Sequence, residues 1–140
     1  MALRLSTTTR YGLRALIELA KNREGEFISL KEISKRQKIP IRYLENIMLK
    51  LVGGGIVVSS RGKGGGFKLS RDPSEIKISD VIEFLEGPIS LVPCLEDSSL
   101  CSRTTKCETR GLWAELKRAL WKTLEEKRLS DLIKEKGGIQ

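Results

Sequence analysis

Apolar residues recur at three- and four-residue spacing in five stretches of the chain, which predicts a mainly helical protein. In one stretch Leu44, Ile47, Met48 and Leu51 fall on a single helix face. Ser29 and Glu32 form a capping box, which predicts that a helix begins there. The predicted helices cover residues 7–22, 29–38, 40–51, 78–87 and 109–127, with a further helical turn over 129–133.

The pattern changes between the third and fourth helices. Two short runs, Ile56–Val58 and Phe67–Leu69, flank a glycine-rich turn at Arg61–Gly66. A strand, a glycine turn and a second strand predict a β-hairpin. A hairpin that directly follows two short helices is typical of a winged helix-turn-helix, a DNA-binding fold.

The last helix carries a large apolar surface for so small a protein. Its apolar residues recur at three- and four-residue steps: Leu112, Trp113, Leu116, Leu120, Trp121 and Leu124. We expect a partner to cover this surface, which predicts a homodimer with this helix at its interface. The alternative is that the helix packs back on its own domain.

The charge of the 140-residue chain lies in its first half. Residues 1–70 hold 14 of the 26 basic and 5 of the 18 acidic residues, so that half carries +9 and the other half −1. A basic half joined to a near-neutral half is typical of a DNA-binding unit with a second part attached. We therefore predict a winged helix-turn-helix domain over 1–76 and a cysteine-containing dimerisation region over 77–140.

Polar side chains crowd the first turns of the predicted recognition helix, where such helices meet base edges. Arg42 can bind phosphate or guanine, Glu45 can accept from cytosine and Asn46 can pair with adenine. The Tyr43 hydroxyl can reach a phosphate, and Pro40 begins the helix. For each residue alone, the alternative is an ordinary solvated helix face.

The hairpin turn adds two cations, Arg61 and Lys63, among glycines such as Gly64 that allow close approach of the backbone. An arginine at a hairpin tip suits a narrow minor groove. A nucleotide phosphate loop is the rival interpretation, but here the lysine precedes the glycines and no Gly-Lys-Ser/Thr follows. Phe67 is expected to lie in the core beneath the hairpin.

Three cysteines, Cys94, Cys101 and Cys107, lie within 14 residues of one polar stretch, and the chain has no histidine. The odd number argues against a disulfide framework, and the missing histidine excludes imidazole metal sites and histidine-based catalysis. Clustered thiols point to a metal or cluster site, with redox thiols and zinc as alternatives. No membrane span or signal segment is visible, so we expect a cytoplasmic protein. Because the chain has no histidine to act as a general base and no phosphate loop, we expect that it is not an enzyme.

Four segments together resemble the Rrf2 family of bacterial transcription regulators: RLSTTTRYGLRAL, ISKRQKIPIRYLENIM, VSSRGKGGGFKLS and ISDVIEFLEG. The cysteine triplet before a Leu-Trp helix is most similar to the iron–sulfur branch of that family, which includes iron–sulfur and nitric-oxide sensors. The resemblance covers residues 3–124.

The resemblance implies a homodimeric regulator that binds a double-stranded DNA operator. Tyr43, Glu45 and Arg61 match the family's DNA-reading positions, with Pro40, Arg42 and Asn46 beside them. It also implies a 2Fe–2S or 4Fe–4S cluster held by Cys94, Cys101 and Cys107 and by a fourth ligand that is not cysteine.

This sequence departs from the family at that fourth ligand. Arg110 stands where some members have histidine, and Arg10 stands where others have aspartate. The cysteine spacing is also one residue longer than the commonest form. The alternative hypothesis is a cluster-free regulator that is controlled by a partner enzyme, by thiol redox chemistry or by zinc.

Overall fold

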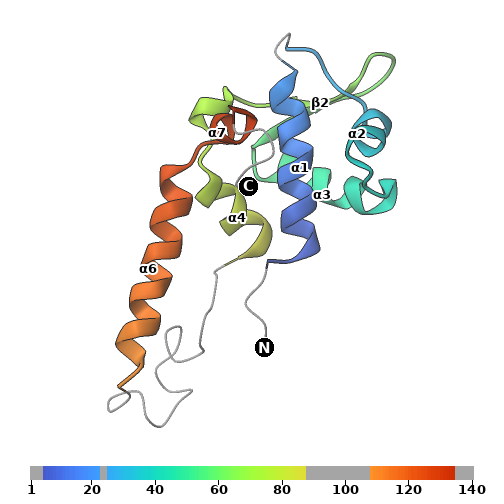
Figure 1. Ribbon diagram of the computed structural model, residues 1–140. Helices are drawn as coiled ribbons and strands as arrows, with labels where there is room; N and C mark the ends of the chain where they lie inside the picture. Colours follow the sequence, from blue (N-terminus) through green and yellow to red (C-terminus); the bar gives the residue numbers. More distant parts are fainter. Residues whose placement is uncertain (1–4, 23–24, 88–107, 135–140) are drawn as a thin grey trace.

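The computed structural model describes residues 5–22, 25–87 and 108–134. It confirms the predicted class, mainly helical with one small hairpin and a long C-terminal helix (Figure 1). The elements in chain order are α1 (Thr7–Lys21), α2 (Leu30–Gln37), α3 (Ile41–Gly53), β1 (Val57–Ser60), β2 (Gly66–Leu69), the 3-10 turn η1 (Pro73–Glu75), α4 (Ile78–Glu86), α6 (Arg110–Glu126) and α7 (Leu129–Lys134).

The helix starts follow local capping. The Ser29 hydroxyl accepts a 3.1 Å bond from the Glu32 amide at the start of α2, as the capping box predicts. Ser6 does the same for Thr9 in α1. Pro40 is the residue that precedes α3. Its ring offers no hydrogen-bond acceptor, but its fixed φ suits a helix start.

The hairpin begins one residue later than the sequence pattern predicts. The pattern places Ile56 in the first strand, but its amide donates to the Leu51 carbonyl at the end of α3 and its side chain is buried in the core. β1 pairs antiparallel with β2, with Ser60 opposite Gly66 and Val57 opposite Leu69. The predicted loop after β2 contains η1, which the Asp72 carboxylate caps.

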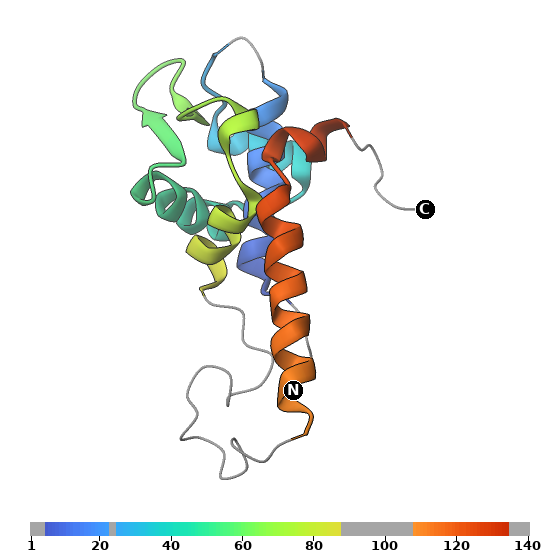
Figure 2. The same cartoon turned by 90° about the vertical axis from the view of Figure 1, so that its left-hand side faces the viewer.

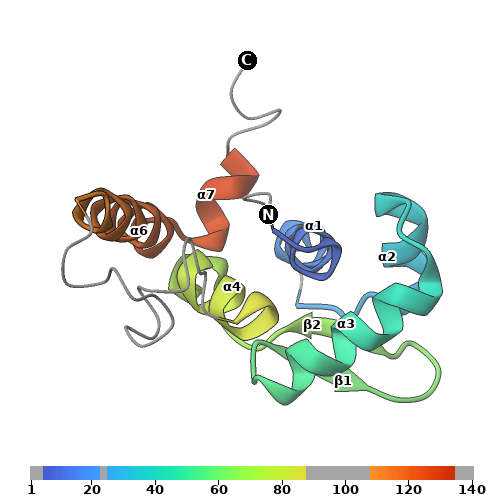
Figure 3. The ribbon, with the colours of Figure 1, turned by 90° about the horizontal axis from the view of Figure 1, so that it is seen from below.

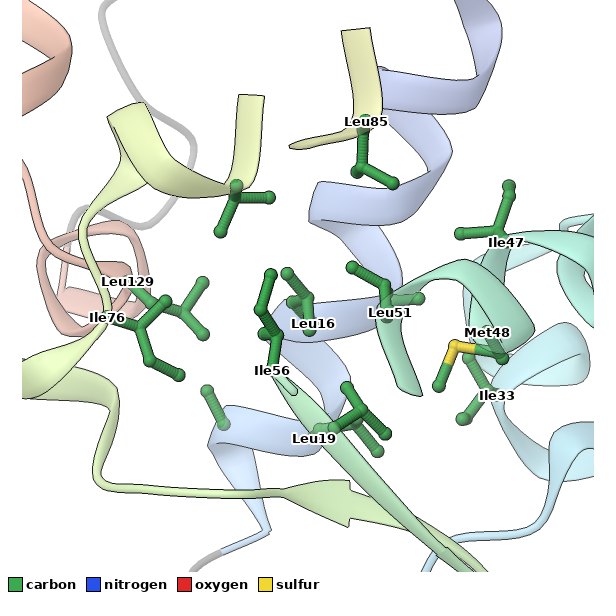
Figure 4. Close-up of a cluster of buried hydrophobic side chains, with 14 of the residues drawn as sticks. Leu16, Leu19, Ile33, Ile47, Met48, Leu51, Ile56, Ile76, Leu85 and Leu129 are labelled. Atoms are coloured by element: carbon green, nitrogen blue, oxygen red, sulfur yellow. The ribbon is translucent and has the colours of Figure 1, made fainter. Parts of the chain in front are cut away.

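The hydrophobic core surrounds α1 (Figure 4). Leu16 and Leu19 of α1 meet Met48 and Leu51 of α3 on one side. Residues that come later in the chain fill the other side: Ile76, Ile78, Val81, Ile82, Leu85 and Leu129. The core therefore takes residues from both sides of position 76, which is the predicted boundary between the two parts of the chain.

The long helix α6 extends away from this core (Figures 1 and 2). It packs against α4, and none of its side chains is buried. The chain then returns to the core, because the Ile78 amide donates to the Lys127 carbonyl and the Leu129 amide to the Ile76 carbonyl. None of the described helices is both long and apolar enough to span a membrane.

Candidate nucleic-acid interface

The helix-turn-helix consists of α2, a short turn and α3. Lys38 makes the turn in the left-handed conformation, with φ of 55°, and Ile39 beside it is buried in the core. Left-handed backbone is unfavourable for a residue with a Cβ, so tertiary packing must hold this turn. The turn fixes the direction in which α3 leaves α2.

A polar network holds α2 against α1. The Gln37 amide donates a 2.6 Å bond to Glu18, which is 7% exposed. Arg14 donates to both the side chain and the carbonyl of Gln37. Arg36 lies within 3.7 Å of Glu18 and 3.1 Å of Glu32. These contacts fix the helix-turn-helix on the core.

The predicted reading residues lie on the solvent side of α3. Arg42, Glu45 and Asn46 are exposed, and Tyr43 is 61% exposed. Pro40 is exposed at the start of the helix. The buried side of α3, formed by Leu44, Ile47, Met48 and Leu51, faces α1 and the core. All five candidates are therefore available to a ligand.

The start of α1 borders this surface. A hollow of about 560 Å³ lies between the two helices, and α1 contributes Thr7, Thr8 and Tyr11 to it. α3 contributes Tyr43, Asn46, Ile47, Leu49 and Lys50. The sequence pattern gave the threonines only a capping role, because their proximity to α3 arises from tertiary packing. Hydroxyl groups and a lysine in one hollow can bind phosphate oxygens.

The hairpin forms the wing beside α3, with which β1 is in contact (Figure 3). Arg61, Lys63 and Gly64 are exposed at its tip. Gly62 and Gly64 have φ of 88° and 80°, which only glycine adopts readily. Phe67 is partly buried against the core, as predicted, and exchanges two 2.8 Å backbone bonds with Ile28. The wing is thus fixed at its base and presents cations at its tip.

The end of α4 is tied to the start of α1. The Glu86 carboxylate accepts a 2.6 Å bond from the Ser6 hydroxyl and further bonds from the Ser6 amide and the Thr9 hydroxyl. The two hydroxyl donors are the main reason why the pKa of Glu86 lies below its ordinary value. In the sequence, Glu86 precedes by two positions the segment 88–107, which contains the cysteines.

Cys94, Cys101 and Cys107 lie outside the described residues. The described part of the chain contains no group of three or more histidine, cysteine or acidic side chains arranged to hold a metal. Of the two arginines at the family's fourth-ligand positions, Arg110 begins α6 and Arg10 is exposed and donates to Thr7.

The comparison with known proteins agrees with this geometry. The family model for Rrf2, described as an iron-dependent transcriptional regulator, matches residues 5–135. The regulator IscR of Cereibacter sphaeroides is 36% identical over 136 residues, which are 94% of this chain and 88% of that protein. CymR of Bacillus subtilis is 37% identical over 138 residues, which are 99% and 95% of the two chains.

Solved structures give the same result. The structure of B. subtilis CymR, named as the global cysteine regulator, superposes with a TM-score of 0.80 at 38% identity, covering 95% of this chain and 98% of that one. The structure of T. potens IscR superposes with a TM-score of 0.76 at 32% identity, covering 96% of this chain and 88% of that one. This chain therefore belongs to the Rrf2 family of transcription regulators.

Proposed function

We propose that this Rrf2 regulator binds a double-stranded DNA operator as a homodimer, and that a cluster held by Cys94, Cys101 and Cys107 controls this binding. The observation that carries the DNA part is that β1 of the wing contacts α3 and that both the wing and α3 expose cations. Arg42, Arg61 and Lys63 are all exposed there.

Each element has a separate role in this proposal. α3 would enter the major groove, where Arg42, Glu45 and Asn46 meet base edges. The wing would place Arg61 in the neighbouring minor groove and Lys63 near phosphates. The hollow between α1 and α3 would hold a backbone phosphate, with Thr8, Tyr43 and Lys50 as donors.

The donor chemistry of the cysteines supports a cluster. Cysteine thiolates are the usual protein ligands of iron–sulfur centres, and the family model is described as iron-dependent. A guanidinium has donors and no acceptor, so neither Arg110 nor Arg10 fits the fourth position. A carboxylate, a hydroxyl or water would complete the set. When bound, the cluster would supply sensitivity to iron–sulfur status, redox state or nitric oxide.

In this proposal, a change at the cysteines would act on the DNA-binding elements through α1. The cysteine segment is bounded by Glu86, which is bonded to the start of α1, and by α6, which packs on α4. α1 in turn borders α3 at the hollow. A signal of this kind shifts DNA affinity only by as much as it favours one arrangement over the other.

A second candidate function is a regulator without a cluster. The similarity to CymR, named as a cysteine regulator, favours it, as does the structure named as the oxidized form of Staphylococcus aureus CymR, at 31% identity. The three cysteines would then act as thiol switches or bind zinc, or a partner enzyme would control the protein. We assign no catalytic activity in either case, because the chain lacks histidine and a nucleotide phosphate loop.

Anaerobic purification with a visible spectrum and with iron and sulfide analysis tests the cluster. We expect a coloured protein with stoichiometric iron and sulfide, and loss of the visible absorbance together with altered operator binding in Cys101→Ser. Unchanged absorbance in that variant would contradict the ligand assignment. A protein that stays colourless after reconstitution would favour the second candidate.

A further inference from the structure

Two aliphatic side chains, Ile41 in the first turn and Leu49 two turns later, are exposed on α3 among polar neighbours. Leu49 lies four residues after Glu45 and three after Asn46, so it continues their side of the helix by one turn. Its exposed fraction is 62%, and it borders the hollow between α1 and α3. The core side of α3 is complete without it, since Leu44, Ile47, Met48 and Leu51 fill that side.

We propose that Leu49 contacts the C5-methyl group of a thymine in the major groove and so selects a T·A base pair in the operator. This inference rests on the proposed DNA binding. The edges of adenine, guanine and cytosine in the major groove present hydrogen-bonding groups, whereas thymine adds a methyl group. An aliphatic side chain gains nothing from a phosphate or a polar base edge, so the methyl group is the matching partner.

The position of Leu49 along the helix specifies where that thymine lies. A rise of about 1.5 Å per residue places Leu49 about 4.5 Å beyond Asn46 and about 6 Å beyond Glu45 along the axis. Base pairs are spaced by about 3.4 Å. The thymine is therefore one or two base pairs from the pair that Glu45 or Asn46 contacts.

Replacement of thymine by deoxyuridine tests the contact, because it removes only the methyl group. The probe is the consensus duplex that the full-length protein selects from a random-sequence library, with single thymines replaced one at a time. Burial of one methyl group predicts that uracil at one position in each half-site weakens binding by about fourfold. Leu49→Ala is expected to bind the thymine and uracil duplexes equally well.

Two further variants separate this contact from other effects. Leu49→Met keeps an aliphatic contact and is expected to keep the preference for thymine. Ile41→Ala removes the apolar side chain in the first turn of α3, which is 48% exposed, and is expected to keep the preference at the same position. Leu49 is exposed, so neither of its variants should unfold the protein.

Three results would overturn the inference. The first is a uracil effect of equal size in Leu49→Ala, which would assign it to another residue or to DNA shape. The second is equal affinity at every substituted position. The third is failure to bind any duplex, which would also overturn the proposed function, whereas the first two leave DNA binding intact.

Discussion

Among single residues, Gly66 decides where the wing attaches. Its φ is 147°, and a Cβ added there would collide with the Ile28 carbonyl. That carbonyl accepts the bond from Phe67 that fixes β2 to the segment before α2. A side chain at Gly66 would separate the wing from the helix-turn-helix.

Gly66→Ala should therefore destabilise the protein by about 2–3 kcal/mol and weaken DNA binding. Gly62→Ala is the matched control in the same hairpin. Gly62 has φ of 88° with nothing within 4 Å of an added Cβ, so that variant should cost only about 1 kcal/mol. Urea unfolding measures both, and equal losses would contradict the role of the Ile28 contact.

Glu86 makes the hydrogen bonds that join the end of α4 to the start of α1, and its pKa gives this contribution a pH dependence. Folding lowers this pKa below the ordinary value of 4.5, so the folded chain favours the carboxylate. The stability gained is present in full above the ordinary value and is lost as the pH falls through the lowered one.

Glu86→Gln should thus lower the urea midpoint at pH 7 and have a smaller effect at an acid pH below the lowered pKa, where the wild-type carboxyl is protonated. Glu83→Gln, an exposed position on the same helix, serves as the control. If Glu86→Gln lowers the urea midpoint equally at both pH values, the charge of Glu86 does not contribute to stability.

The sequence predicts the role of a residue when that role depends on neighbouring positions in the chain, and does not when it depends on distant ones. The caps at Ser29 and Pro40 are local, and the structure has both. Thr7 and Thr8 lie more than 30 positions before the α3 residues with which they line the hollow, and no local pattern contains that packing. For the same reason the bond between Glu86 and Ser6, 80 residues apart, could not be predicted.

The wing is the element whose chemistry is most specific to DNA. Its base is fixed to Ile28, while Arg61 and Lys63 are exposed at the tip. Its existence was predicted from the glycine turn, but its first strand was placed one residue early. The reason is that the backbone amide of Ile56, a β-branched residue typical of strands, donates to the Leu51 carbonyl at the end of α3 instead.

Lys63→Ala should lower DNA affinity across sequences and reduce the slope of log K against log salt by about 0.9, as expected for one lost phosphate contact. Fluorescence anisotropy over a range of salt concentrations measures this slope. Lys122→Ala on α6, also exposed, is the control and should leave the slope unchanged. An unchanged slope in Lys63→Ala would place this lysine away from the phosphates.

At the scale of the whole molecule, α6 presents an apolar surface to solvent. Leu112 is 56% exposed and Leu116 is 40% exposed, while Trp113 and Trp121 on the same helix are partly covered. The packing of α6 on α4 therefore satisfies only part of its apolar surface. We therefore expect the predicted dimer to use the side of α6 that carries these two leucines as its interface.

Leu116→Glu should convert the dimer to a monomer. In a symmetric interface it removes two leucines worth about 1.5–3 kcal/mol each, so the dissociation constant should rise by about 100-fold or more. Analytical ultracentrifugation measures the dissociation constant. Lys122→Glu is the control, because it introduces a carboxylate on the polar side of the same helix. Identical dissociation constants for Leu116→Glu and the wild type would exclude this interface.

The return of the chain to the core after α6 also affects how the protein is made. Leu129 is fully buried and its amide bonds to Ile76, so the core that supports α3 is complete only when residue 129 is in place. We therefore expect the DNA-binding surface to become fully stable during synthesis only after Leu129 has left the ribosome. A chain cut short within α6 should therefore be degraded rather than compete for operators.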